Sequence, residues 1–285
     1  CRRWDNFMSI LIKNGYILDP ASGREGIYDI LIQEDRIVKV EENIQEEADQ
    51  KIDARGMYVM PGFIDLHVHL REPGYEYKET IATGTRSAAR GGFTTVCPMP
   101  NTNPVMDNKE EVLKFSKKVE EDSIVNVLPI GSVTKNQEGK ELADIKGMVE
   151  AGIVGISEDG KSVMNTAIYR EGMLVAKEAG IPVFAHCEDK DLVGDGVMNA
   201  GKKAKELGLS GISNAVEDVI AARDVLLAKD TGVKLHLCHC STKDSVDIIK
   251  VGKKAGIAIT AEVCPHHFVL TDDEIPGDDA NYKMN

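Results

Sequence analysis

The chain has 285 residues, of which 42% are hydrophobic and 28% charged, which is enough apolar material for one large α/β domain or two ordinary ones. Its formal net charge is −13, with acidic and basic residues interleaved, which argues against nucleic-acid and anionic-membrane surfaces because both need basic patches. There is no signal-peptide pattern and no apolar run of the roughly 20 residues that a membrane-spanning helix needs, so the sequence predicts a cytoplasmic protein.

The first part of the chain is rich in short strand-like runs. Residues 1–7 are expected to be a non-native leader, because the first such run begins just after Met8. Residues 8–57 are predicted to form the N-terminal part of a small β-sandwich module. Asn14-Gly15 predicts a hairpin turn between Ser9–Lys13 and Tyr16–Leu18, and Glu34-Asp35 predicts a second hairpin.

From Tyr58 the pattern changes to apolar runs that alternate with amphipathic helical stretches. The expected strands are Val59–His69, Phe93–Pro98, Ile124–Ile130, Ile153–Ser157, Val183–Cys187, Val233–Cys238 and Ile257–Val263. The expected helices are Thr80–Arg90, Lys109–Glu121, Ile168–Ala179, Ala215–Ala228 and Ser245–Ala255, several of them followed by glycine. Repeated β-α units of this kind predict a parallel sheet that winds in one direction.

Residues 58–285 therefore predict an α/β fold of the (β/α)8 TIM-barrel type. Such a barrel needs eight strands and about 250 residues. Only seven strands are expected, and the last stretch, Thr271–Asn285, is polar, so we expect a barrel that lacks its last strand. A doubly wound open sheet is the alternative, but the G-x-G-x-x-G phosphate turn that would favour it is not found.

Four of the seven histidines and one aspartate stand at the ends of predicted strands. His67 and His69 end the first strand, where residues two apart face the same way. Asp159 ends the fourth strand, His186 the fifth and His239 the sixth. Any one of these histidines alone would more often be a core or surface residue. Barrel enzymes place their chemistry at strand ends, however, and four imidazoles with a carboxylate suit one or two zinc ions.

Several weaker features leave alternatives open. Asp65 shares the face of His67, and a supporting role for the metal site and a plain strand-capping role are about equally favoured. The residues His236, Cys238 and Cys240 invite a second, structural zinc site, but side chains packed under helices are the favoured interpretation. His266 and His267 are expected to line the pocket without binding metal.

The six cysteines are expected to be reduced. Most stand inside apolar strand-like runs, where a free cysteine behaves as a small buried hydrophobic residue. These are Cys97, Cys187, Cys238 and Cys264.

Specific motifs carry a resemblance to a known family. Residues Val59–Gly74, with the segment Phe63-Ile-Asp-Leu-His-Val-His-Leu-Arg71, resemble the signature of the amidohydrolase superfamily. The segments Arg71-Glu-Pro-Gly, Gly91-Gly-Phe-Thr-Thr and Met99–Pro104 are similar to those of dihydroorotases. The resemblance continues in family order through Ser157–Gly160, Ala185–Glu188, Leu235–Thr242, Ala261–His267 and Lys283–Asn285.

The resemblance is to the class I dihydroorotases in particular. Many amidohydrolases hold two metals with a carboxylated lysine at the end of strand four, whereas Ile153–Gly160 contains no lysine and Asp159 stands at that place. This disfavours a hydantoinase, and the Arg71-Glu-Pro-Gly loop disfavours an allantoinase, although another cyclic amidohydrolase remains an alternative.

The resemblance implies a zinc-dependent hydrolase that interconverts (S)-dihydroorotate and N-carbamoyl-L-aspartate in pyrimidine biosynthesis. The implied zinc ligands, for one or two ions per subunit, are His67, His69, Asp159, His186 and His239. The implied substrate-binding residues are His69, Arg71, Asn101 and Asn285. The family's general acid/base aspartate ends strand eight and is expected beyond residue 285, so this chain is expected to bind metal weakly and to turn over little or no substrate.

The resemblance also carries alternatives for partners. Some dihydroorotase-like chains are catalytically silent scaffolds for aspartate carbamoyltransferase, and such chains usually lose metal ligands. This chain keeps every ligand that it is long enough to contain, which favours the enzyme. An aspartate carbamoyltransferase partner and a homodimer both stay open.

Overall fold

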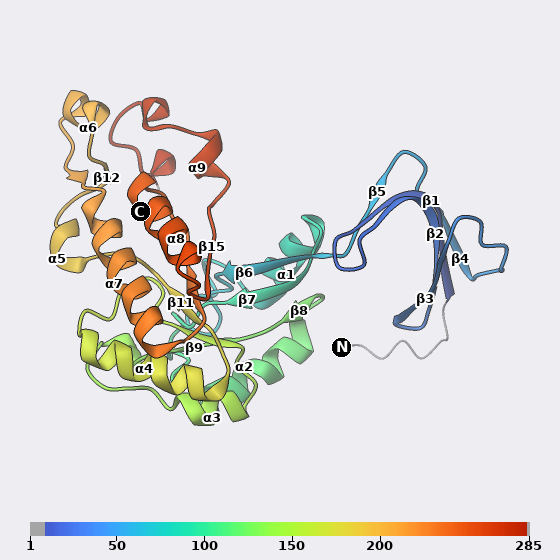
Figure 1. Cartoon of the computed structure of the whole chain (residues 1–285), viewed down its shortest axis with the longest axis horizontal. Coiled ribbons are helices and arrows are strands. Elements are labelled where there is room, and N and C mark those ends of the chain that lie inside the picture. The colour runs from blue at the N-terminus through green and yellow to red at the C-terminus, as the bar shows by residue number, and fades with distance from the viewer. Residues whose placement is uncertain (1–8, 284–285) are drawn as a thin grey trace. The chain divides into compact units, whose positions relative to one another are not determined.

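The computed structural model describes residues 9–283 and is shown in Figure 1. The expectations for residues 1–7 and for Asn285 lie outside these described residues. Contacts divide the chain into two compact units, which we call the β module (residues 1–64 and 92–94) and the α/β unit (residues 65–91 and 95–285). The expected domain boundary between residues 57 and 58 stays a prediction.

The described part of the β module forms one five-stranded sheet in the order β3-β2-β1-β4, with β5 also paired to β1. Its central hairpin is antiparallel, whereas β4 and β5 run parallel to β1. Leu11, Leu31 and Ile44 form its buried core. The strands are β1 (Ser9–Asp19), β2 (Arg24–Gln33), β3 (Arg36–Glu41), β4 (Gln50–Asp53) and β5 (Tyr58–Val59).

The predicted hairpin at Asn14-Gly15 is wrong, because β1 runs straight through it. Asn14 has a φ of 60° and the register with β2 shifts there, so the pair makes a β-bulge rather than a turn. The buried Asp29 carboxylate fixes the bulge by accepting the Asn14 backbone N–H at 2.8 Å. A Cβ on Gly15 would lie 2.5 Å from Val59 Cγ2, so close packing explains the glycine. The predicted turn at Glu34-Asp35 is confirmed between β2 and β3.

The strands that lie wholly or mostly in the α/β unit form three sheets: β6-β7-β8, β9-β10-β11-β14-β15 and the small sheet of β12 (Met198–Asn199) with β13 (Gly211–Ile212). The pairs from β9 to β15 are all parallel, as the β-α alternation predicts. The strands are β6 (Phe63–Val68), β7 (Phe93–Pro98), β8 (Asn126–Val127), β9 (Ile130–Ser132), β10 (Gly155–Ser157), β11 (Val183–Ala185), β14 (Leu235–Leu237) and β15 (Ile259–Ala261).

The single strand predicted for Ile124–Ile130 is divided in two by Pro129. Its first half, β8, pairs with β7, and the residues after the proline form β9, which pairs with β10. Proline lacks the N–H that a continuous ladder needs, so the chain passes from one sheet to the next at this point. The strands consequently follow one another in space as they do in sequence, without the reversal that a doubly wound sheet requires.

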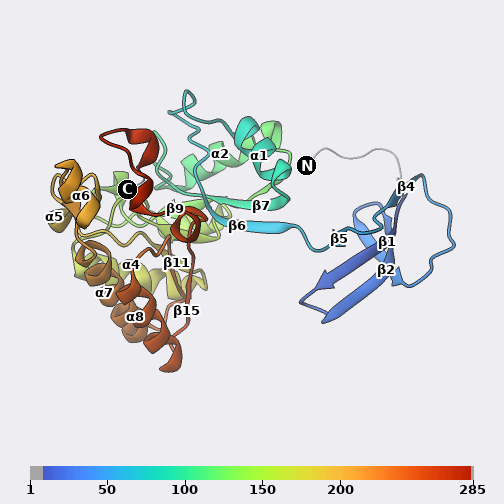
Figure 2. The same ribbon diagram turned by 90° about the horizontal axis from the view of Figure 1, so that it is seen from above.

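Five long helices lie between these strands close to their predicted positions, and Figures 1 and 2 show the helices of this unit outside the strands. Their ends follow ordinary capping rules. Asn165 stands just before α4 and its side chain accepts two backbone N–H groups of the first turn, and Gly180 ends that helix in the left-handed conformation. The long helices are α1 (Ile81–Arg90), α2 (Lys109–Asp122), α4 (Thr166–Ala179), α7 (Ala215–Thr231) and α8 (Lys243–Lys254).

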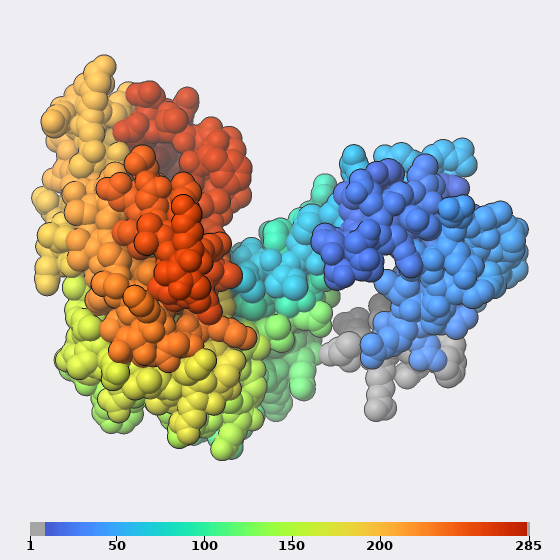
Figure 3. Space-filling view, in the orientation of Figure 1, coloured from blue at the N-terminus to red at the C-terminus, as the bar shows by residue number. Residues whose placement is uncertain are grey.

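Shorter elements occupy the connections of the α/β unit. Ile275 is buried against Met198 and Ala204, so the segment after β15 packs near α6, as the neighbouring red and orange surfaces in Figure 3 show. None of the helices in residues 9–283 is long and apolar enough to cross a membrane. The shorter elements are α3 (Ile145–Glu150), α5 (Lys190–Val193), β12 (Met198–Asn199), α6 (Lys202–Leu207), β13 (Gly211–Ile212), α9 (His266–Val269) and the 3-10 turns Lys135–Gln137, Asp272–Glu274 and Ala280–Tyr282.

Candidate metal centre

The five predicted metal ligands come together at the strand ends of the α/β unit. His67 lies in β6, and His69 follows that strand by one residue. Asp159, His186 and His239 follow β10, β11 and β14. Because neighbouring parallel strands end at one edge of a sheet, these residues meet although they are far apart in sequence.

The buried Asp159 carboxylate is the centre of the group. Its Oδ1 lies 3.2 Å from His67 Nε2, 3.5 Å from His186 Nδ1 and 3.7 Å from His239 Nε2, and its Oδ2 lies 3.5 Å from His69 Nε2. His186 Nδ1 and His239 Nε2 are only 3.0 Å apart. We call these five residues the strand-end cluster.

The hydrogen bonding of one atom in this cluster indicates whether a metal ion fits there. Asp159 Oδ1 is buried and makes no hydrogen bond of acceptable geometry, although three imidazole nitrogens converge on it. An unsatisfied buried acceptor costs about 1–3 kcal/mol, so native structures rarely keep one without a partner. His67, Asp159 and His239 can present ligand atoms within 4.8 Å of one another, and imidazole and carboxylate are donors that zinc accepts. The residues therefore fit a divalent cation.

The electrostatics of the cluster favour positive charge at its centre. Burial opposes a charged His67, but the close Asp159 and Glu262 carboxylates outweigh it and raise the pKa of His67 to about 9. Burial likewise works to raise the pKa of Asp159, and the surrounding histidines overcome it and hold that pKa far below its usual range. Burial lowers the pKa of His69, helped by the neighbouring charges of His67 and Arg71. A divalent cation would be stabilised by the same two carboxylates that stabilise charge on His67.

Glu262, for which the sequence predicted no role, contacts two histidines of this cluster. Its Oε1 lies 2.8 Å from His67 Nδ1 and accepts the backbone N–H of His239 at 3.3 Å, and its Oε2 lies 3.1 Å from His236 Nε2. Such a carboxylate fixes the tautomer and the orientation of a ligating imidazole. The sequence signal that could have identified Glu262 is its position directly after β15. The same kind of position, at the end of a strand, identified the predicted ligands.

The other predicted site residues lie beside the cluster where they are described. Asn101 Oδ1 is 3.1 Å from His69 Nδ1, and Asn101 Nδ2 donates to Asp159 Oδ2 at 3.3 Å. Arg71 has a φ of 58° and His239 a φ of 35°, a backbone region that non-glycine residues seldom adopt and that clusters at functional sites. Asn285 falls outside residues 9–283.

Two acidic residues that lie close to the predicted ligands in the sequence accept backbone N–H groups. The Asp65 carboxylate accepts the backbone N–H of His67 at 3.1 Å, while the ring of His67 contacts Glu262. Glu158 is buried and accepts the backbone N–H groups of Val133 and Thr134 at 3.2 and 3.0 Å. Glu158 thus holds the segment after β9, and Asp159, one residue later, is left to face the histidines.

Two further groups among residues 9–283 could present metal ligands. One is His67 with Cys238 and Glu262, and the other is Cys264 with His266 and His267. Among the described residues, the side chains of His236, Cys238 and Cys240 do not form a group that could hold one metal ion. The His236 ring instead contacts Thr260 and Glu262. Four of the five described cysteines are buried and free, as expected, whereas Cys264 is only partly buried.

Comparisons with known proteins point to one family. A family model described as Dihydro-orotase-like matches residues 56–245. A dihydroorotase of Staphylococcus aureus is 50% identical over 276 residues, and one of Staphylococcus epidermidis is 49% identical over 277 residues. Each alignment covers 96% of this chain but 65% of the relative, so the chain spans about two thirds of the length of these proteins.

Solved structures agree on the fold. An L-hydantoinase from Arthrobacter aurescens superimposes with a TM-score of 0.79 at 23% identity, covering 93% of this chain and 60% of that one. A D-hydantoinase from a Thermus species gives a TM-score of 0.74 at 27% identity, covering 96% of this chain and 60% of that one. These proteins are TIM-type barrels, so the predicted fold class is confirmed.

Proposed function

This chain belongs to the dihydroorotase-like family, and on that premise we propose that it is a zinc-dependent class I dihydroorotase. It would catalyse the reversible interconversion of (S)-dihydroorotate and N-carbamoyl-L-aspartate in pyrimidine biosynthesis. The observation that carries the proposal is the convergence of four imidazoles on the unsatisfied, buried Oδ1 and on the neighbouring Oδ2 of Asp159.

The proposed zinc ligands are the five residues of the strand-end cluster. When bound there, zinc supplies a water with a pKa lowered to roughly 7 and a Lewis acid for the amide carbonyl. The Asp159 carboxylate offers two oxygens, one facing His67, His186 and His239 and the other facing His69. That geometry suits one ion or two.

The chain's own residues would bind and orient the substrate. Dihydroorotate carries a carboxylate, for which the planar fork of the Arg71 guanidinium is the proposed partner. The charge of Arg71 contributes to the low pKa of His69, which indicates that it acts at this end of the cluster. Asn101 is proposed to share the carboxylate while its amide keeps His69 and Asp159 in place. Asn285 is proposed as a further contact.

We also propose a cytoplasmic location, which the free thiols of the described cysteines support. A homodimer and a complex with aspartate carbamoyltransferase are the proposed assemblies, drawn from the family alone. Both are tested after the metal and the activity are known.

The first experiment measures zinc content and turnover in the same preparations. The chain is purified, stripped of metal and titrated with Zn2+, and loss of dihydroorotate is then followed with allantoin and hydantoin as alternative substrates. Metal binding is measured first because all five proposed ligands lie within this chain, which spans 65% of its relatives' length. His67→Ala is the test variant, and Asp195→Asn, a change at an exposed residue that contacts none of the five ligands, is its control.

The expected result is zinc that this chain binds weakly and that falls in His67→Ala, with any turnover confined to dihydroorotate. Turnover of hydantoin or allantoin in preference to dihydroorotate would overturn the substrate assignment. Failure to bind zinc would overturn the metal assignment. Zinc binding without any turnover, in a protein that spans the full length of the relatives, would indicate a silent, dihydroorotase-like chain, and association with aspartate carbamoyltransferase would be measured next.

A further inference from the structure

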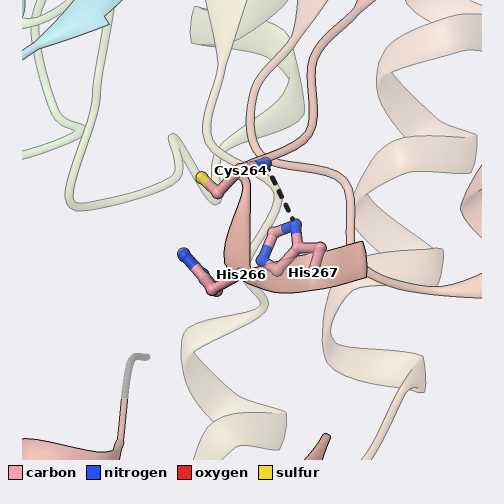
Figure 4. A group of neighbouring side chains, drawn as sticks. All are labelled: Cys264, His266 and His267. Carbon is pink, nitrogen blue, oxygen red and sulfur yellow. Dashed lines mark hydrogen bonds between the residues drawn. The ribbon is translucent and has the colours of Figure 1, made fainter. Parts of the chain in front are cut away.

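A second group of metal-binding side chains follows β15 and shares no residue with the strand-end cluster. Cys264, His266 and His267 can present one sulfur and two ring nitrogens within 4.8 Å of one another. Figure 4 shows the three side chains around the start of α9, with Cys264 and His266 extending to the same side. We call this group the Cys264 cluster.

The backbone around the Cys264 cluster is held by local hydrogen bonds. The His267 N–H donates to the Cys264 carbonyl at 3.0 Å, and the Leu270 N–H donates to the His266 carbonyl at 3.1 Å. Pro265 stands between the ligand residues and fixes its own φ, which restricts the turn further. The three ligand residues thus sit within four positions of a structured turn, so little chain entropy opposes their meeting.

The side chains need only small movements to share one cation. Ligand atoms around a tetrahedral zinc are separated by roughly 3.3–3.8 Å, given bond lengths of about 2.0–2.3 Å. Separations of up to 4.8 Å close to that range by rotation about the side-chain bonds. His267 Nδ1 accepts the Cys264 backbone N–H at 3.3 Å, a long hydrogen bond that a metal bound at the ring would replace at little cost.

The donor set selects a particular class of metal. One thiolate and two imidazoles are borderline-soft ligands, which favour zinc and its neighbours over magnesium or calcium.

Accessibility separates this cluster from the other cysteines. Cys264 is partly exposed, whereas Cys97, Cys187, Cys238 and Cys240 are buried. His266 and His267 are partly exposed as well, so an ion can reach the cluster from solvent. A fourth protein ligand is not part of the group among residues 9–283.

We propose that Cys264, His266 and His267 form a second metal site that binds one Zn2+ ion through a thiolate and two imidazoles, with its fourth position open to water or an external ligand. Binding forms a metal–sulfur bond and releases the proton of the Cys264 thiol to solvent. The site goes beyond the proposed catalytic metal and does not depend on it.

Cobalt titration of the full chain tests the thiolate ligand. Co2+ replaces Zn2+ in such sites and gives a near-ultraviolet charge-transfer band only when a thiolate is bound. We expect this band in the unmodified chain, its loss in Cys264→Ser, and one Co2+ fewer bound per chain in that variant. Cys238→Ser is the matched control, because Cys238 can also approach a metal beside His67 and Glu262.

Alkylation mapped by mass spectrometry tests the imidazole ligands without relying on colour. Zn2+ should protect Cys264 from iodoacetamide in the unmodified chain, and the protection should disappear in His266→Gln and in His267→Gln, which leave the thiol in place. A Co2+ band that is absent, or lost only in Cys238→Ser, would overturn the proposal. So would Cys264 alkylation that Zn2+ does not slow.

Discussion

The strand-end cluster and the Cys264 cluster reach a similar set of ligands by opposite routes. The strand-end cluster draws residues from β6 and from the segments after β10, β11 and β14, spread from His67 to His239. The Cys264 cluster takes its three ligands from four consecutive positions. In the first, the sheet sets the geometry, whereas in the second the local turn does.

This difference sets how much each cluster depends on the rest of the fold. Asp159 is almost fully buried, and its histidines are oriented by other side chains such as Glu262 and Asn101. The Cys264 cluster is partly exposed, and its own backbone is its main support. The strand-end cluster should therefore bind metal more tightly and should lose more when a supporting residue is changed.

Replacing the central carboxylate should have the largest effect on metal binding. Asp159→Asn keeps the shape of the side chain but removes the charge on which the histidines converge. We expect Zn2+ affinity at the strand-end cluster to fall by at least about 100-fold, beyond the roughly 10- to 100-fold cost of losing a supporting residue. Competition with a chromogenic chelator measures this affinity.

Asp195→Asn is the matched control for that experiment, because Asp195 is exposed and contacts only Ser210 among the hydrogen bonds that we describe. It should leave the affinity unchanged. An Asp159→Asn chain that binds Zn2+ within a few-fold of the unmodified chain would show that the strand-end cluster does not depend on its central charge.

The free energy of unfolding should depend on pH because the carboxyl of Asp224 is buried. Burial raises the pKa of Asp224 in α7 to about 6, although hydrogen bonds with Arg223 and Tyr169 work against it. A carboxyl whose pKa is raised on folding adds stability below its unfolded pKa of about 3.9, and that stability is lost as pH rises through about 6.

Asp224→Asn should remove this dependence. The difference in unfolding free energy between the unmodified chain and the variant should change by about 2 kcal/mol between pH 4 and pH 7, since one pKa unit corresponds to about 1.4 kcal/mol and part of the change lies below pH 4. Urea unfolding of metal-free protein at several pH values measures it. Asp230→Asn, which changes an exposed carboxylate on the same helix, is the control. Parallel curves for the unmodified chain and Asp224→Asn would refute the prediction.

Removing the supporting carboxylate should weaken metal binding by less than removing the central one. Glu262→Gln keeps the size of the side chain but removes the charge that faces His67 and His236. We expect Zn2+ affinity at the strand-end cluster to fall by roughly 10- to 100-fold with the number of bound ions unchanged. Glu206→Gln, on the exposed face of α6, serves as the control. An unchanged affinity would mean that Glu262 supports only the fold.

The sequence was most informative where strand ends meet. The rule that chemistry lies at the carboxyl ends of barrel strands predicts one group made of five side chains, and these side chains do lie together: His67, His69, Asp159, His186 and His239. Periodicity and helix-ending glycines also gave the five long helices to within a few residues. These features follow from short-range patterns repeated along the chain.

The features that the sequence did not reveal depend on contacts between distant residues. Asn14-Gly15 has the composition of a turn, but the Asp29 carboxylate and the packing of Val59 convert it into a bulge. Glu262 contacts His67 and His236 only once the barrel strands are adjacent. His266 and His267 were expected to line a pocket without metal, and only the position of Cys264 beside them suggests otherwise.

The smallest expected effect tests the independence of the two clusters. The double variant His67→Ala/His69→Ala removes two ligands from the strand-end cluster and none from the Cys264 cluster. Since the Cys264 cluster is built from its own turn, Zn2+ should still slow alkylation of Cys264 to the same extent as in the unmodified chain. His267→Gln in the same background provides the positive control, because it should abolish the protection. If the double variant alone abolished it, the two clusters would have to be treated as one metal-binding unit, and the contrast between a sheet-built and a turn-built site would no longer hold.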